Sequence, residues 1–209
     1  MTVTTLDSPL PALLYTPQAA QAGAPLPLVL FLHGSGERGR DLNRVRLQGL
    51  PRELEIGRDL PAHVLAPQCP EGVWWEDVAA RLSALLDNVE GRLSIDPDRV
   101  LVTGLSMGGF GTWALALREP GRFAALAPVC GGGDPTRAAE LAHLPQRVFH
   151  GALDEVVPPE RSAEMVEALR AAGADVRFTL YPDLAHDSWT RAYGEAGLYD
   201  WLLAQRRKT

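Results

Sequence analysis

Residues 104–108, Gly-Leu-Ser-Met-Gly, form a G-x-S-x-G pentapeptide with Ser106 at its centre. The apolar run 98–103 before it is typical of a short buried strand, and the apolar run 109–117 after it is typical of a helix. A strand that turns this abruptly into a helix holds the central serine in strained backbone geometry and lifts its hydroxyl above the end of a sheet. We therefore expect Ser106 to be a nucleophile; the alternative interpretation is an ordinary glycine-rich turn.

A serine hydroxyl is a poor nucleophile at neutral pH, so it needs a base to take its proton and an acid to orient that base. After a serine of this kind the acid comes first in the chain and the histidine second. His186 satisfies that order, because it lies late in the chain in a polar loop after the apolar run 176–181. We expect His186 to be the base; the alternative is a surface loop histidine. His150 is expected to pack at the end of its own strand, and His63 and His143 are expected to be structural or exposed, with no chemistry assigned to them.

The acid candidate is Asp154, which follows the apolar run 147–150. Groups that perform chemistry gather at the carboxyl ends of strands in parallel sheets, and Asp154 lies at such an end. It would hold the imidazole in one tautomer and stabilise the imidazolium. Two alternatives remain open at this stage, Glu155 in the same turn and Asp134 after the segment 129–133.

A tetrahedral intermediate also needs hydrogen-bond donors for its oxyanion. One expected donor is the backbone N–H of Met107, directly after the serine. The second should come from the glycine-rich loop 33–39, which follows the apolar run 27–32. We favour the N–H of Ser35, with Gly34 as the alternative. A phosphate-binding loop is disfavoured, because residues 34–39 match neither of the two common glycine-rich phosphate motifs.

Together, the loop 33–39, the pentapeptide 104–108, the Gly151-x-x-Asp154-x-x-x-Pro158 turn and His186 resemble the α/β-hydrolase superfamily. More narrowly, they resemble the small bacterial serine esterases grouped with dienelactone hydrolases, carboxylesterases and prolyl-oligopeptidase-like proteins. The resemblance implies an eight-stranded fold or a trimmed version of it, an acyl-enzyme mechanism and no cofactor. It leaves the substrate open. Dienelactone hydrolases proper use a cysteine nucleophile, whereas this chain has Ser106 at that position.

The pattern along the chain agrees with an α/β fold. Apolar strand-length runs alternate with helical stretches at 76–93, 160–172 and 195–206, as expected for a mostly parallel sheet covered on both faces. We expect a three-layer α/β/α sandwich. With 209 residues and 46% hydrophobic content, residues 1–209 are most simply one domain.

Composition disfavours several classes of partner. The 26 acidic and 20 basic residues give a net charge of −6 without a basic patch, so nucleic acid is not expected. Cys69 and Cys130 are expected to be buried free thiols in a reducing compartment, and no Cys or His pair has the spacing of a metal site. The N-terminus lacks the pattern of a signal peptide and no apolar run is long enough to span a membrane, so we expect a cytoplasmic protein. The oligomeric state stays open.

Two features bear on the substrate. Only about a dozen residues separate Cys130 from Leu144, too few for a helical cap, so we expect an open site. At least one of Trp74 and Trp75 is expected to form an aromatic wall, and Arg38 to meet an acidic substrate group or Glu37. The sequence thus predicts a serine carboxylester hydrolase for short-chain or aryl esters. The alternatives are a serine peptidase or thioesterase, or a catalytically silent binding protein.

Overall fold

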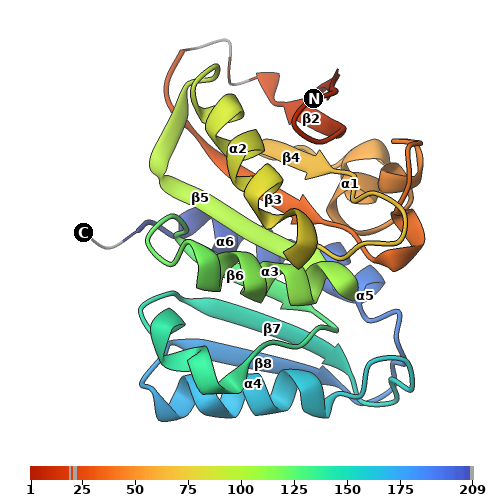
Figure 1. Ribbon diagram of the computed structural model, residues 1–209, viewed down its shortest axis with the longest axis vertical. Coiled ribbons are helices and arrows are strands. Elements are labelled where there is room, and N and C mark those ends of the chain that lie inside the picture. Colours follow the sequence, from red (N-terminus) through yellow and green to blue (C-terminus); the bar gives the residue numbers. More distant parts are fainter. Residues whose placement is uncertain (19, 21–22, 208–209) are drawn as a thin grey trace.

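A central eight-stranded sheet organises the molecule (Figure 1). The computed structural model describes residues 1–18, 20 and 23–207. The strand order across the sheet is β1-β2-β4-β3-β5-β6-β7-β8, so β1 and β8 are its two edges. The strands are β1 (Thr2–Leu6), β2 (Ala12–Thr16), β3 (Leu26–Leu32), β4 (His63–Pro67), β5 (Ile95–Leu105), β6 (Ala125–Val129), β7 (Gln146–Gly151) and β8 (Val176–Tyr181).

Strand directions decide where functional groups can meet. From β4 to β8 all neighbouring strands are parallel, whereas β2 pairs antiparallel with both β1 and β4. The carboxyl ends of β3, β5, β6, β7 and β8 therefore lie along one edge of the sheet. In open α/β sheets this edge is where ligands bind.

Helices cover both faces of the sheet (Figure 1). The α-helices are α1 (Gly49–Glu55), α2 (Ala79–Glu90), α3 (Met107–Arg118), α4 (Glu160–Ala171), α5 (Trp189–Gly194) and α6 (Ala196–Ala204). In the view of Figure 1, α2, α3 and α4 lie in front of the sheet, with α5 and α6 behind it. Alternation along β3 explains both layers: Leu28, Leu30 and Leu32 join the core under α2–α4, and Val29 and Phe31 join the core under α1, α5 and α6.

The three-layer α/β/α architecture with a mostly parallel sheet is confirmed. The predicted helix 76–93 is a short 3₁₀ helix, η4 (Glu76–Val78), followed by α2. Strand β1 was not predicted, because its alternating polar residues are largely exposed at the edge of the sheet. Between β6 and β7, residues 130–145 form only the 3₁₀ helix η5 (Pro135–Leu141), and the described part of the chain contains no cap domain.

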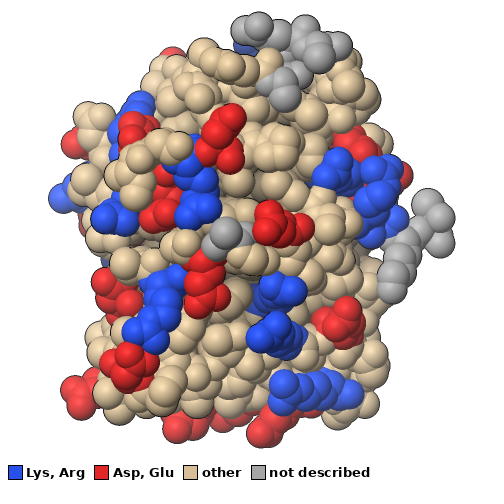
Figure 2. Space-filling view, turned by 180° about the vertical axis from the view of Figure 1, so that it is seen from behind, with Lys and Arg blue, Asp and Glu red and all other residues tan. Residues whose placement is uncertain are grey.

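Charged side chains are distributed without a dominant sign. On the face turned toward the viewer in Figure 2, Lys and Arg side chains alternate with Asp and Glu side chains. Within the described residues, we find no helix with the length and apolar character needed to cross a membrane.

Candidate active site

Ser106 lies in the turn between β5 and α3, and its backbone is strained as the pentapeptide predicts. Its φ of 53° and ψ of −118° place a residue with a side chain in a region that normally favours glycine. The two flanking glycines make this turn possible. A Cβ atom on Gly108 would lie 1.9 Å from the carbonyl oxygen of Leu32, and one on Gly104 would lie 2.3 Å from the carbonyl oxygen of Gly108. The turn therefore fits against β3 only without side chains at these positions.

Three of the predicted site residues form a continuous hydrogen-bonded chain. The Oγ of Ser106 lies 3.0 Å from Nε2 of His186, and Nδ1 of His186 lies 2.7 Å from Oδ2 of Asp154. Because a carboxylate only accepts, Nδ1 carries the proton when His186 is neutral. Nε2 is then free to accept the hydroxyl proton of Ser106. This arrangement leaves the imidazole oriented to act as a base toward the serine.

The Asp154 carboxylate is buried and saturated with donors. Its Oδ1 accepts the backbone N–H groups of Val156 and Val157, each at 2.9 Å. Burial opposes its ionisation, but the hydrogen bonds from His186, Val157 and Val156 outweigh burial and hold the pKa of Asp154 below its usual value. Asp154 is therefore a carboxylate at neutral pH.

The two alternative acids lie elsewhere. Asp134 caps η5, where its carboxylate accepts the backbone N–H and the hydroxyl of Thr136. Glu155 is exposed to solvent. Since Asp154 occupies the Nδ1 side of His186, neither alternative acid makes this contact.

A second histidine, His150, lies against the same carboxylate. It is fully buried at the end of β7, and its Nε2 is 3.2 Å from Oδ2 of Asp154. The sequence analysis placed this ring at the end of its strand and missed its contact with Asp154. The signal was available, because the histidine precedes the acid candidate by four residues in the turn that follows an apolar strand.

The loop that carries His186 is packed closely on β7. A Cβ atom on Gly151 would lie 2.2 Å from the carbonyl oxygen of Ala185, so only glycine permits this approach. The His186 ring packs edge-on against Trp189, with ring centroids 5.1 Å apart, and the Trp189 indole donates to the side chain of Gln48 at 3.0 Å. These contacts help to hold the imidazole in place.

The two predicted sources of the second oxyanion donor differ in the structure. The N–H of Gly34 donates to the Glu37 carboxylate at 2.9 Å and is therefore occupied. Among the described residues, no acceptor is paired with the backbone N–H of Ser35 or of Met107. The geometry thus favours Ser35 over Gly34 as the partner of Met107.

His33 holds this loop from inside the protein. Its Nδ1 lies 2.6 Å from the carbonyl oxygen of Gly34, and its Nε2 accepts the backbone N–H of Cys69 at 2.9 Å. Burial lowers the pKa of His33 to about 4, so the ring is neutral with its proton on Nδ1. The carbonyl oxygen of His33 accepts the indole N–H of Trp75 at 3.0 Å. Both ring nitrogens and the carbonyl of one buried residue therefore position the loop.

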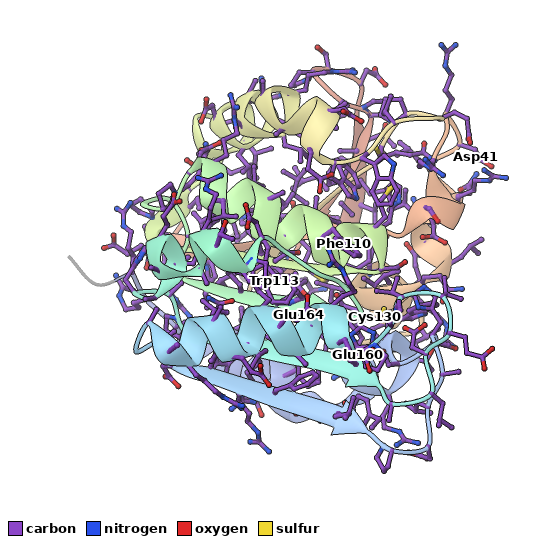
Figure 3. All side chains as sticks on the ribbon, turned by 60° about the horizontal axis from the view of Figure 1, so that its bottom comes forward. Asp41, Phe110, Trp113, Cys130, Glu160 and Glu164 are labelled. Carbon is purple, nitrogen blue, oxygen red and sulfur yellow. The ribbon has the colours of Figure 1, made fainter. Side chains whose placement is uncertain are left out.

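The two adjacent tryptophans separate. Trp75 is 1% exposed and its ring packs where Gly111 leaves space, so of the two tryptophans it is not the one that can line a substrate wall. Trp74 is 48% exposed and packs edge-on against Phe110, with centroids 6.3 Å apart. Phe110 lies on α3, one turn after Ser106 (Figure 3). Trp74 remains a candidate wall residue.

Within the described residues, the Arg38 side chain is bonded to backbone carbonyl groups rather than to a carboxylate. Its Nε donates to the carbonyl oxygen of Ser35 at 3.0 Å, and its Nη1 donates to that of Val73 at 3.3 Å. The suggested pairing with Glu37 is wrong, because the Glu37 carboxylate is bonded to Gly34 instead. Arg38 links the loop after β3 to the segment that carries Trp74.

Cys130 lies beside Asp154 and His186, and ligand atoms of the three residues all lie within 4.8 Å of one another. The donor set does not suit a metal ion, because His186 already uses one nitrogen toward Asp154 and the other toward Ser106. Burial also raises the pKa of the Cys130 thiol well above its usual value, whereas a metal ligand must be a thiolate. Cys69 and Cys130 are both buried free thiols, as predicted.

One cavity lies beside the candidate site rather than over it. It has a volume of about 470 Å³ and runs along α3, from Phe110 and Gly132 to Leu117 and Arg118. Neither Ser106 nor His186 lines it. The short β6–β7 connection forms no cap domain in the described part of the chain.

Comparisons with known proteins agree with this architecture. The model of the dienelactone hydrolase family matches residues 66–196. Over 192 residues, covering 82% of this chain and 71% of the relative, the chain is 29% identical to a provisionally named carboxymethylenebutenolidase of Escherichia coli O157:H7. A stretch of 54 residues, covering 26% of this chain and 13% of the relative, is 46% identical to poly(3-hydroxyalkanoate) depolymerase C of Paucimonas lemoignei.

Among solved structures, a thermostable esterase superposes with a TM-score of 0.84 at 33% identity. The superposition covers 99% of this chain, which spans only 63% of that esterase. The family match covers more than half of the chain, and the sheet topology and the strained serine turn are those of the superfamily suggested by the motifs. The chain therefore belongs to the dienelactone hydrolase family and is a hydrolase built on the α/β-hydrolase fold.

Proposed function

We propose that this protein is a serine carboxylester hydrolase that works through an acyl-enzyme. The observation that supports this most directly is the hydrogen-bonded chain from Ser106 through His186 to Asp154. A cysteine mechanism is disfavoured, since burial raises the pKa of the Cys69 thiol to about 11 and raises that of Cys130 further.

In the proposed reaction, Nε2 of His186 takes the proton of Ser106 as the serine Oγ attacks the ester carbonyl. Asp154 stabilises the imidazolium that forms. The backbone N–H groups of Met107 and Ser35 stabilise the oxyanion, and His186 then gives the proton to the leaving alcohol. Water repeats the sequence on the acyl-enzyme, releasing the acid and restoring Ser106.

Several observations favour an ester with a short acyl chain or an aryl group. The relatives include proteins named as an esterase and as a polyester depolymerase. Because the described residues form no cap domain, a long acyl chain would stay largely in water, whereas the exposed ring of Trp74 offers a flat surface to an aryl group. A serine peptidase or thioesterase on the same fold is the alternative, together with a silent binding protein.

Labelling with a fluorophosphonate probe tests the function, because the probe reports an activated serine whatever the substrate. We expect the parent protein to be labelled and Ser106→Ala to be unlabelled, with ester turnover lowered by at least about 10³-fold. An unlabelled parent would indicate a binding protein. A panel of p-nitrophenyl esters, matching thioesters and aminoacyl anilides then identifies the bond that is cleaved, and faster cleavage of the anilides would contradict the esterase proposal.

A further inference from the structure

His150 lies outside the Ser106–His186–Asp154 chain but contacts three polar partners, one of which is Asp154. Its Nδ1 lies 2.7 Å from the hydroxyl of Ser162 on α4. Its Nε2 lies 2.9 Å from the carbonyl oxygen of Val157 and 3.2 Å from Oδ2 of Asp154. The side chains of His150 and Ser162 are both fully buried, so water does not substitute for these contacts.

The chemistry of these partners fixes where the proton lies. A carbonyl oxygen and a carboxylate oxygen only accept, so Nε2 of His150 must donate. Burial lowers the pKa of His150 despite the neighbouring Asp154, which favours the neutral ring with a single proton. Nδ1 is then an acceptor, and the hydroxyl of Ser162 donates to it. That hydroxyl also lies 2.9 Å from the carbonyl oxygen of Gly131, so Nδ1 of His150 and this carbonyl oxygen share its single proton.

We propose that His150 is a positioning residue that holds the Asp154 carboxylate in place for His186. Oδ2 of Asp154 accepts from Nε2 of His150 on one side and from Nδ1 of His186 on the other, so one oxygen bridges two imidazoles. This role rests on the serine hydrolase function proposed above.

The remaining contacts of Asp154 explain why a second imidazole matters. The two backbone N–H groups at Val156 and Val157 bind Oδ1 and belong to the same turn as Asp154, so they move with it. His150 belongs to β7 and is tied through Ser162 to α4. His150 therefore ties Oδ2 of Asp154 to β7 and α4. In metal sites, groups that orient a ligand in this way contribute about 10–100-fold to activity or affinity.

Three substitutions separate positioning from packing. His150→Gln keeps an amide donor near the position of Nε2, whereas His150→Leu fills the site without any donor. Ser162→Ala removes the hydroxyl that contacts Nδ1 of His150. His63→Leu is the matched control. His63 is also a buried histidine, but it lies at the start of β4, and no hydrogen bond of the described residues links it to Ser106, His186 or Asp154.

The readouts are kcat and KM for p-nitrophenyl acetate, the thermal midpoint, and the downfield proton NMR signal of the hydrogen bond between His186 and Asp154. For His150→Leu we expect kcat to fall by about 10–100-fold, with KM within about twofold of the parent, and the downfield signal to shift or disappear. His150→Gln should regain most of kcat and the signal. Ser162→Ala should show a smaller loss in the same direction, and His63→Leu should leave kcat and the signal unchanged.

Unchanged kcat and an unchanged downfield signal in His150→Leu would overturn the proposal. So would equal losses in His150→Gln and His150→Leu that follow the fall in thermal midpoint, since these indicate packing alone. If His150→Leu fails to fold, His150→Asn replaces it, because its shorter amide reaches Ser162 but not Asp154. Failure of the function itself is distinguished by the parent, which would then resist the fluorophosphonate probe.

Discussion

The Glu37 carboxylate accepts the backbone N–H of Gly34 at 2.9 Å, within the loop that supplies the proposed oxyanion donor Ser35. Burial raises the pKa of Glu37, with the hydrogen bond from Gly34 opposing that effect. The contact closes a tight turn over residues 34–37. Within this turn the Glu37 carboxylate binds the N–H of Gly34, and the N–H of Ser35 has no acceptor among the described residues. Glu37 thus supports the proposed oxyanion loop and would keep the N–H of Gly34 from competing with Ser35 for the substrate oxygen.

Glu37→Ala should loosen this loop and lower kcat for p-nitrophenyl acetate by about tenfold. The expected loss is smaller than the 10²–10³-fold typical of removing a donor outright, because the N–H of Ser35 is still present. Glu37→Gln keeps an acceptor for Gly34 and should lose less than Glu37→Ala. Steady-state kinetics check both variants, and parent-like kcat in Glu37→Ala would mean that the loop needs no such support.

Asp154→Asn should lower kcat by about 10⁴-fold, because the amide favours the wrong tautomer of His186 while leaving the shape of the site intact. Asp134→Asn should retain parent activity, since Asp134 only caps η5. Glu155→Gln should also retain it. Stopped assays at the same pH compare the three, and an active Asp154→Asn together with an inactive Asp134→Asn would show that the acid is assigned to the wrong residue.

Replacement of glycine by alanine should lower the stability of the fold at Gly108 and raise it at Gly197. A methyl group on Gly108 would lie 1.9 Å from the Leu32 carbonyl oxygen, so Gly108→Ala should cost at least about 3 kcal/mol of unfolding free energy. Gly197 lies in α6 with no atom within 4 Å of an added methyl, so Gly197→Ala should stabilise by about 0.5 kcal/mol. Urea unfolding measures both. A Gly108→Ala protein as stable as the parent would mean that β5 and α3 can move apart from β3.

Stability should fall as the pH is lowered from neutral toward 4. The pKa of His33 is about 4 in the folded protein and 6.5 in the unfolded chain, because burial disfavours the charged ring. For such a base the full stability is present above pH 6.5 and is lost as the pH falls toward 4, by up to about 3 kcal/mol. His33→Gln should be less stable at neutral pH and show a shallower decline. Urea midpoints from pH 7 to pH 4 test this, and the same dependence of the midpoint on pH in the parent and in His33→Gln would contradict it. Some pH dependence should remain in His33→Gln, because burial also lowers the pKa values of His63 and His150.

The short β6–β7 connection leads to a prediction of acyl preference. Each methylene of an acyl chain contributes about 0.8 kcal/mol only if it is fully removed from water. Because no cap covers the site within the described residues, kcat/KM should be highest for acetyl to about hexanoyl esters and gain little beyond them. A series of p-nitrophenyl esters measures this. A steady rise to the palmitoyl ester would reveal an acyl groove.

The sequence was sufficient for the residues whose positions follow from strand ends. Ser106, Asp154 and His186 each come directly after an apolar run, so a parallel sheet places them at one edge whatever the details of the loops. It was not sufficient where the outcome depends on the packing of distant segments. Trp75 is buried because Gly111 on α3 leaves space for its ring, and the adjacent Trp74 has no such space.

Side-chain networks were the least predictable part of the site. The contact of His150 with Asp154 needs the turn conformation that brings the carboxylate back toward β7, and the partner of its other ring nitrogen, Ser162, comes from α4. The hydrogen bond from Gly34 to Glu37 likewise depends on the 3₁₀ helix η2 (Ser35–Glu37), which the glycine-rich sequence of the loop does not predict. Periodicity identifies strands and helices, but it carries no information on which polar atoms will face one another.

Because β8 lies at the edge of the sheet, the members of the proposed triad are held by strands that differ in their resistance to local unfolding. Ser106 follows β5, which is paired on both sides, whereas His186 follows β8, which is paired only with β7. Elements with fewer neighbours open more readily than the centre of a fold. Heat or denaturant should therefore detach the base while the serine turn is still intact, so that the protein loses turnover before it loses its shape and regains it when the edge closes again.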